Sequence, residues 1–148
     1  MKILIIEDEI TKEQDILRFL QELDVGSTAE VKHSITSGIA EIRENQYDYI
    51  LLDMSLPIYD NDDITYSEDN EFETFGGNYV LDELDRIDYS VKVVVITAFD
   101  ILGEGKNRIE LTQVEKGLYE DYPDVFLGTV FYDASSVEWK KRLREYLS

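Results

Sequence analysis

The sequence contains no cysteine, only two prolines and a single histidine among its 148 residues. Without thiols, the chain can form neither disulfide bonds nor thiolate zinc sites. It also lacks a long apolar run, a signal peptide, a lipidation motif and an internal repeat. These absences argue against a membrane-spanning helix and lead us to expect a cytoplasmic protein.

Basic residues are scarce as well: 14 Lys and Arg stand against 33 Asp and Glu, which gives a formal net charge of −19. A chain of this charge repels phosphate groups, so we expect neither nucleic acid nor an anionic membrane as its partner. The length fits one domain, and a hydrophobic content of 43% is enough to build a core. We therefore expect a single domain over residues 1–148.

Short, continuous apolar runs are the most informative feature that is present. The run Tyr49-Ile50-Leu51-Leu52 is too short for a buried helix and is typical of a central parallel strand covered on both faces. Asp53 stands where this strand ends, and Pro57 marks the following loop because proline cannot continue a central strand. The same reasoning predicts strands at about residues 2–6, 29–31, 91–96 and 125–131.

Amphipathic stretches separate these strands. Apolar residues recur at helical spacing within about residues 11–23, 36–45, 77–87, 111–121 and 135–146. Thr11 with Gln14, and Ser135 with Glu138, have capping-box spacing. We therefore predict Thr11 and Ser135 as the N-caps of the first and last helices.

Five strands alternating with five helices predict an α/β fold, a flavodoxin-like (βα)5 doubly wound parallel sheet with right-handed crossovers. The five-strand order of such sheets is 2-1-3-4-5, which makes strands 1, 3 and 4 neighbours. Their carboxyl ends carry Glu7-Asp8, Asp53 and Thr97. Three acids and a hydroxyl are thus predicted to converge at the edge where open α/β sheets bind ligands.

Clustered carboxylates repel one another, so burying them is costly unless a cation or protons intervene. A hard divalent cation, Mg²⁺ above all, takes oxygen ligands and leaves positions open for phosphate oxygens. An Asp beside such a cation can act as a nucleophile and form an aspartyl phosphate. The alternative is an acidic rim without chemistry.

With these residues in place, the chain resembles the receiver domain of bacterial two-component response regulators over nearly its whole length. The resemblance lies in the segments Ile3-Leu4-Ile5-Ile6-Glu7-Asp8-Glu9, Asp53-Met54-Ser55-Leu56-Pro57 and Val93-Val94-Val95-Ile96-Thr97-Ala98. It implies a phosphoprotein of signal transduction, which receives its phosphoryl group from a histidine kinase or a phosphotransfer protein.

The resemblance also implies roles for single residues. Asp53 would be the phosphoacceptor. Asp8, helped by Glu7, would bind Mg²⁺ together with Asp53 and the Ser55 carbonyl. Thr97 would be the switch hydroxyl, which turns toward the phosphate and repositions the face formed by the last strand and helix.

Two departures from the family pattern stand out. The family carries a lysine at the end of its last strand, whereas residues 129–135 hold no basic residue. Lys140 and Lys141 lie further on in the last helix and are expected to face away, so the cation that couples phosphorylation to the switch is expected to be missing. The acidic segment Tyr59 to Thr74 is also longer than the usual turn, and its mixed aromatics suggest an insertion that recognises a partner.

Two alternatives stay open beside a working receiver. A pseudo-receiver would bind its partner without being phosphorylated, and the missing lysine favours it. A haloacid-dehalogenase-like phosphatase would need a second Asp two residues after Asp53, where Ser55 stands. We therefore expect a stand-alone receiver with no extension after Ser148, not an enzyme, which acts on a downstream protein partner; this interpretation also allows a homodimer.

Overall fold

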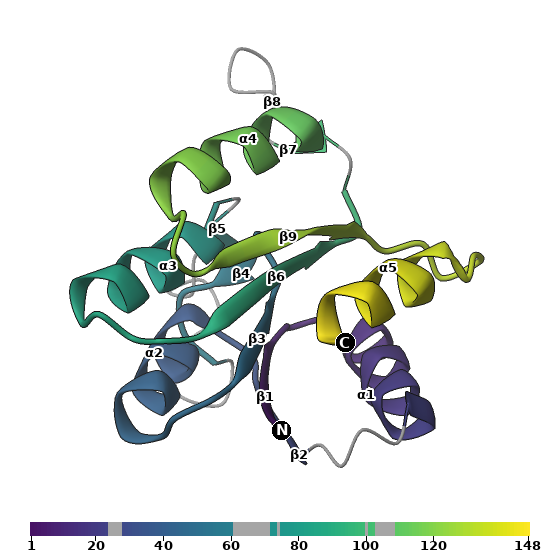
Figure 1. The fold of residues 1–148 in the computed structure, drawn as a ribbon, viewed down its shortest axis with the longest axis horizontal. Coiled ribbons are helices and arrows are strands. Elements are labelled where there is room, and N and C mark those ends of the chain that lie inside the picture. Colours follow the sequence, from purple (N-terminus) through teal and green to yellow (C-terminus); the bar gives the residue numbers. More distant parts are fainter. Residues whose placement is uncertain (24–27, 61–71, 74, 100, 103–108) are drawn as a thin grey trace.

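The computed structural model describes residues 1–23, 28–60, 72–73, 75–99, 101–102 and 109–148. Its centre is a parallel sheet of five strands in the order β2-β1-β3-β6-β9, which is the predicted 2-1-3-4-5 order counted along the chain (Figure 1). The strands are β1 (Lys2–Ile6), β2 (Thr28–Lys32), β3 (Tyr49–Leu52), β6 (Lys92–Thr97) and β9 (Phe126–Phe131). The predicted α/β fold is confirmed.

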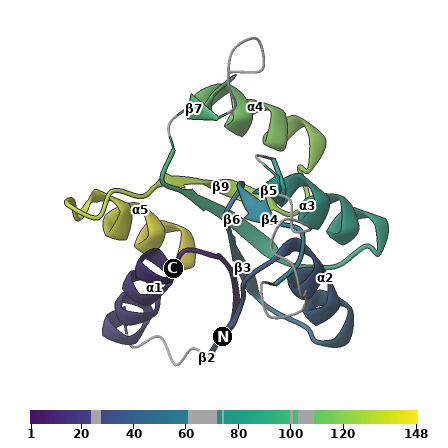
Figure 2. The same ribbon diagram turned by 180° about the vertical axis from the view of Figure 1, so that it is seen from behind.

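Five helices cover the two faces of this sheet. They are α1 (Ile10–Leu23), α2 (Ile35–Glu44), α3 (Gly77–Arg86), α4 (Leu111–Asp121) and α5 (Glu138–Leu147). Helices α1 and α5 pack on one face, whereas α2, α3 and α4 pack on the other (Figures 1 and 2). Each face has its own hydrophobic core, one around Phe19 and Trp139 and the other around Ile42 and Leu84.

The continuous apolar runs are explained by the helices that cover both faces of the sheet. All four residues of β3 are buried, and alternate ones point into opposite cores: Ile50 contributes to the α2–α3–α4 side and Leu51 to the α1–α5 side. A strand buried on both faces gains from apolar residues at every position. By contrast β2, at the sheet edge, has three exposed positions followed by two partly buried ones.

Within the described part of the chain, four two-residue strands lie outside the main sheet. Strand β4 (Leu56–Pro57) pairs antiparallel with β5 (Phe72–Glu73), and β7 (Ile101–Leu102) pairs antiparallel with β8 (Ile109–Glu110). Strand β5 falls in the acidic segment, where the sequence shows no strand period, so that part of the interpretation is wrong. Of the predicted insertion over residues 59–74, residues 61–71 and 74 lie outside the described residues.

Both predicted N-caps are wrong. Helix α1 begins at Ile10 because the Glu9 carbonyl already accepts the first helical hydrogen bond, from the Glu13 N–H at 3.0 Å. Helix α5 begins at Glu138, because Ser135 is held in a turn in which its hydroxyl donates to Asp133 Oδ1 at 2.7 Å. A capping-box pattern names residue types, and the neighbouring hydrogen bonds select which residue starts the helix.

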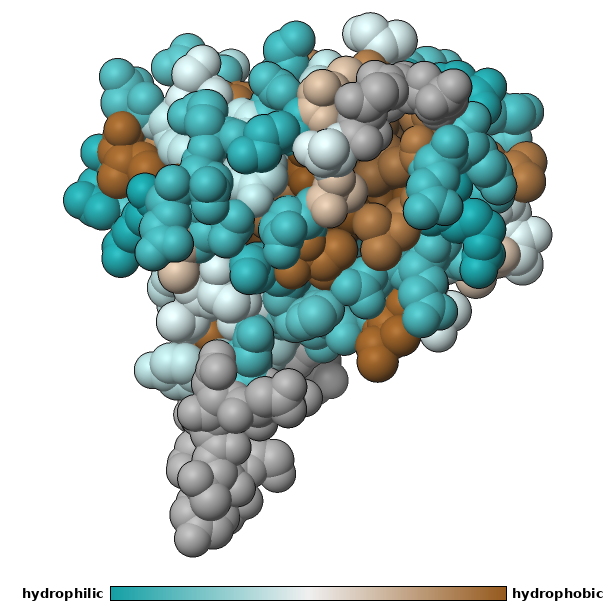
Figure 3. All heavy atoms as spheres, turned by 90° about the horizontal axis from the view of Figure 1, so that it is seen from below, coloured by the Kyte–Doolittle hydropathy of each residue, from teal (hydrophilic) through white to brown (hydrophobic). Residues whose placement is uncertain are grey.

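The surface reflects the charge-rich composition. Figure 3 shows hydrophilic side chains over most of the face seen from below, with hydrophobic residues gathered toward its middle. Among the helices of the described part of the chain, none is long and apolar enough to cross a membrane.

Candidate functional site

The carboxyl ends of β1 and β3 bring three carboxylates together. Glu7 and Asp8 follow β1 directly, Asp53 follows β3, and the two strands are held in register by the Asp53 N–H, which donates to the Ile6 carbonyl at 3.1 Å. One carboxylate oxygen from each of the three residues lies within 4.8 Å of the others. Glu7 is 2% exposed and Asp53 is 7% exposed, while Asp8 is half-buried.

Thr97 and Ser55 lie at the same edge of the sheet. Thr97 is the last residue of β6, which pairs with β3, and it is completely buried. Its hydroxyl oxygen accepts a hydrogen bond from the Phe99 N–H at 3.2 Å, and its carbonyl accepts one from the Tyr132 N–H at 2.7 Å. Ser55, two residues beyond Asp53, is 6% exposed.

A fourth charged group, which the sequence analysis missed, lies inside the acid cluster. The Lys12 side chain is 1% exposed, and its Nζ lies 2.5 Å from Glu7 Oε1 and 3.5 Å from Asp53 Oδ2. The same ammonium donates to the Ile96 carbonyl at 2.7 Å. Residues 129–135 hold no basic residue, as the sequence shows, but Lys12 supplies a positive charge inside the acid cluster from a different element.

A signal for Lys12 was present in the helical period. The buried residues of α1 include Lys12, Ile16, Phe19 and Leu20, so Lys12 lies one turn before Ile16 on the face that packs on the sheet. The sequence prediction takes Thr11 as the N-cap, with Lys12 directly after it, and does not include Lys12 in the apolar face of the helix.

Burial dominates the electrostatics of the cluster. It raises the pKa of Glu7 to about 7, with Lys12 opposing the rise and the Asp53 carboxylate adding to it. Burial likewise raises the pKa of Asp53, against the attraction of Lys12, and that of Asp8, where Glu7 adds to the rise. The desolvation free energy of the charged carboxylates is therefore larger than the stabilisation that the Lys12 ammonium gives them.

The cluster fits a divalent cation. Three ionised carboxylates and one ammonium leave a formal charge of −2, which one such ion cancels. Asp53 Oδ1 is buried and finds no hydrogen-bond partner among the described residues. A buried oxygen of this kind calls for a ligand, and oxygen donors are what Mg²⁺ prefers.

The backbone that carries Asp53 is held by α3. The Gly77 N–H donates to the Met54 carbonyl at 2.9 Å, and a Cβ at Gly77 would lie 2.8 Å from Met54 Sδ and 2.9 Å from the Asp53 carbonyl oxygen. The close approach of helix and loop therefore requires glycine at this position.

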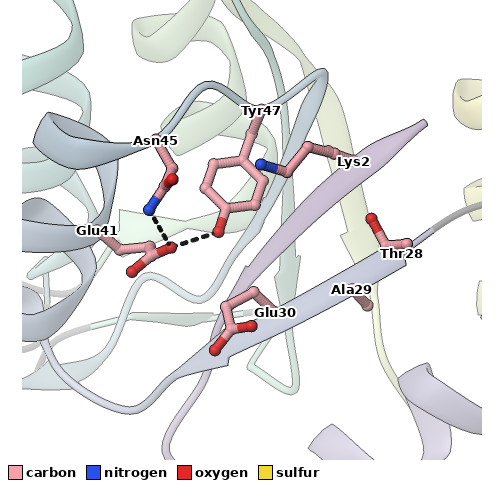
Figure 4. Close-up of a pocket in the computed structure, with 7 residues that line it drawn as sticks. All are labelled: Lys2, Thr28, Ala29, Glu30, Glu41, Asn45 and Tyr47. Carbon is pink, nitrogen blue, oxygen red and sulfur yellow. Dashed lines mark hydrogen bonds between the residues drawn. The ribbon is translucent and has the colours of Figure 1, made fainter.

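A separate cavity of ≈ 260 Å³ lies near the amino ends of β1 and β2 (Figure 4). In its lining, Glu41 Oε1 accepts hydrogen bonds from the Tyr47 hydroxyl at 2.5 Å and from the Asn45 amide at 3.0 Å. The carboxylate there is already satisfied within the protein, unlike that of Asp53. The acid cluster is accordingly the stronger candidate site.

Comparison with known proteins gives relatives that span the chain, although no family model matches it. The Detocs response regulatory protein DtcB of Enterobacter cloacae (strain JD6301) is 30% identical over 145 residues, covering 97% of this chain and 95% of the relative. The uncharacterized protein y4jR of Sinorhizobium fredii (strain NBRC 101917 / NGR234) is 28% identical over 144 residues, covering 97% and 95%.

Solved structures of receiver domains share the fold. The response regulator TrrA of Thermotoga maritima, in complex with Mg²⁺ and a beryllium fluoride, superposes with a TM-score of 0.60 at 16% identity, covering 98% of this chain and 97% of that one. The receiver domain of the Francisella response regulator 1452 gives a TM-score of 0.60 at 18% identity, covering 99% and 98%. With a response regulatory protein as a relative along nearly its whole length, this chain belongs to the response-regulator receiver family.

Proposed function

We propose that this protein is a working receiver, in which Asp53 accepts a phosphoryl group from a histidine kinase or a phosphotransfer protein. Glu7, Asp8, Asp53 and the Ser55 carbonyl would hold the Mg²⁺ that the reaction uses. The observation that carries the proposal is the buried Asp53 carboxylate, whose Oδ1 has no partner among the described residues although two further carboxylates lie within 4.8 Å.

The chemistry follows from the position of Asp53. One of its oxygens attacks the donor phosphorus and forms the O–P bond of an aspartyl phosphate. The P–N bond of a phosphohistidine donor breaks, and the electron pair stays on the imidazole, which takes up a proton from water. Mg²⁺, when bound, neutralises charge on the phosphoryl oxygens. Glu7 and Asp8 orient the nucleophile by holding that ion beside it.

Thr97 would transmit the conformational effect of phosphorylation to the neighbouring strand. Its hydroxyl would leave the Phe99 N–H and turn toward a phosphoryl oxygen, which frees the loop after β6. Because the Thr97 carbonyl is bonded to the Tyr132 N–H, the change reaches the end of β9.

The output would be a contact with a downstream protein. A groove of ≈ 500 Å³ lies between α4, β9 and α5, where Phe131 is 44% exposed and Trp139 forms part of the wall. A groove with an exposed aromatic residue offers the kind of anchor that protein interfaces use. Its position beside the end of β9 places it within reach of the Thr97 relay.

A second candidate is a pseudo-receiver that signals by binding alone. The observation in its favour is the Lys12 ammonium, which already neutralises part of the acid cluster without a metal or a phosphoryl group.

Incubation with acetyl phosphate and Mg²⁺, followed by intact-mass measurement, separates the two candidates. We expect one added phosphoryl group on the wild type and none on Asp53→Asn. Asp124→Asn is the matched control, because Asp124 is exposed just before the amino end of β9, whereas the acid cluster lies at the carboxyl ends of the strands. A wild type that gains no phosphoryl group and binds no beryllofluoride would be a pseudo-receiver.

A further inference from the structure

Lys12 is buried where the proposed phosphoryl transfer would take place. A lysine is almost never buried to this degree unless it is paired. Its Nζ makes two short contacts, to Glu7 Oε1 at 2.5 Å and to the Ile96 carbonyl at 2.7 Å. An ammonium has three N–H donors, so one is left beyond these two bonds.

The remaining donor lies beside the nucleophile. Asp53 Oδ2 is 3.5 Å from Lys12 Nζ, at the outer limit of a hydrogen bond. Phosphorylation of Asp53 would replace a singly charged carboxylate by a group with three charged or polar oxygens, which extend beyond the carboxylate. A fixed ammonium at this distance can donate a hydrogen bond to one of those oxygens without a large movement.

The end of β9 supports Lys12 in this position. Tyr132, the first residue after β9, is 5% exposed, and the centre of its ring lies 6.0 Å from Lys12 Nζ. Its hydroxyl donates to Asp15 Oδ2, one turn further along α1. The strand end therefore carries an aromatic ring that packs against α1 and bonds to it, close to the lysine.

From these contacts we propose that Lys12, delivered from the first turn of α1, is the cation that contacts and stabilises the phosphoryl group on Asp53. It takes over the charge that the family supplies from the end of the last strand. Its bond to the Ile96 carbonyl, next to Thr97, also connects the phosphoryl group to the switch residue. The inference rests on the proposed function, since it assigns a group to that reaction.

The test compares the initial rate of phosphorylation by acetyl phosphate at saturating Mg²⁺ with the dissociation constant of Mg²⁺. For Lys12→Met, which removes the charge and keeps an unbranched side chain, we expect the rate to fall ~100-fold, as when a fixed donor to a developing charge is removed. We expect Mg²⁺ to bind at least as tightly as in the wild type, because the acid cluster loses a competing cation. A lysine with a merely structural role would weaken metal binding together with the rate.

Two further variants make the result specific. Lys12→Arg keeps the charge and should retain more of the rate than Lys12→Gln, whose amide supplies donors to Glu7 and Ile96 without a charge. Lys12→Gln also replaces Lys12→Met if the latter does not fold. Lys141→Met is the control, because Lys141 is exposed on α5, far along the chain from the acid cluster, and its ammonium forms a surface ion pair with Glu138.

The failures are distinguishable. One outcome is that the wild type is phosphorylated on Asp53 while Lys12→Met and Lys12→Gln react within ~3-fold of its rate, whereas loss of a fixed donor should lower the rate far more. In that case the role of Lys12 is refuted and the proposed function stands. If the wild type never forms the Asp53 adduct, the role of Lys12 and the proposed function are both refuted.

Discussion

Glu7→Gln is expected to change how the stability of the metal-free protein depends on pH. The Glu7 carboxylate is 2% exposed, and its pKa is raised mainly by burial. The folded protein therefore favours the protonated acid. Because glutamine resembles that neutral form, the variant removes the cost of the charge while nearly keeping the shape of the side chain.

The magnitude follows from the shift. A pKa that rises from 4.5 to about 7 on folding is worth ~3 kcal/mol at ~1.4 kcal/mol per pKa unit. Between these two values the folded protein binds more protons than the unfolded chain, so the free energy of unfolding falls as the pH rises. The stability that protonated Glu7 contributes is complete below about pH 4.5 and is lost as the pH passes about 7.

Urea denaturation in the presence of a chelator, repeated at several pH values, measures this difference. Relative to Glu7→Gln, the wild type should be of similar stability near pH 4.5 and ~3 kcal/mol less stable above pH 7. Excess Mg²⁺ should stabilise the wild type preferentially, because ionised Glu7 then has a cation to bind. A difference between the two proteins that is flat, or that favours the wild type as the pH rises, would refute the electrostatic account of the cluster.

Three further predictions concern the metal, the backbone and the acidic segment. Mg²⁺ should raise the melting temperature of the wild type and of Asp124→Asn, whereas Asp8→Asn should lose that shift; an unchanged shift in Asp8→Asn would contradict the metal site. Gly77→Ala should lower the free energy of unfolding by ~1–3 kcal/mol, because its Cβ meets backbone 2.9 Å away. Gly117→Ala, where nothing lies within 4 Å in the middle of α4, should instead stabilise by ~0.5–1 kcal/mol, and equal effects would contradict the argument. Replacing residues 61–71 with a Gly-Ser turn should keep the fold, since β4 and β5 already pair at the two ends, and should lose the partner; recovery of that partner at unchanged affinity in a pull-down would show that the segment does not recognise it.

Local patterns determined the architecture. Continuous apolar runs such as Tyr49–Leu52 require cover on both faces of a sheet, and their alternation with amphipathic stretches leaves few arrangements open, because crossovers between parallel strands are right-handed. Once the strand order was fixed, the residues after each strand were fixed in space as well. The sequence alone therefore predicted that Glu7, Asp8 and Asp53 lie close together in the folded chain.

The hydrogen bonds at element ends were decided by tertiary structure. Phe72–Glu73 forms a strand only because Leu56–Pro57 lies opposite it, and neither segment has enough residues to show a period. Ser135 is drawn into a turn by Asp133 and so does not cap α5. Contacts of this kind depend on which groups become neighbours after folding.

Lys12 illustrates the same limit within the site. The sequence contains the lysine, and the spacing to Ile16 allows it to face the sheet. The inward direction depends on α1 starting at Ile10 and on the carboxylates of Glu7 and Asp53 lying within reach of its ammonium. A buried charge is stable only beside its partners, and those partners come from other strands, so the charge of this site could be assigned only from the folded chain.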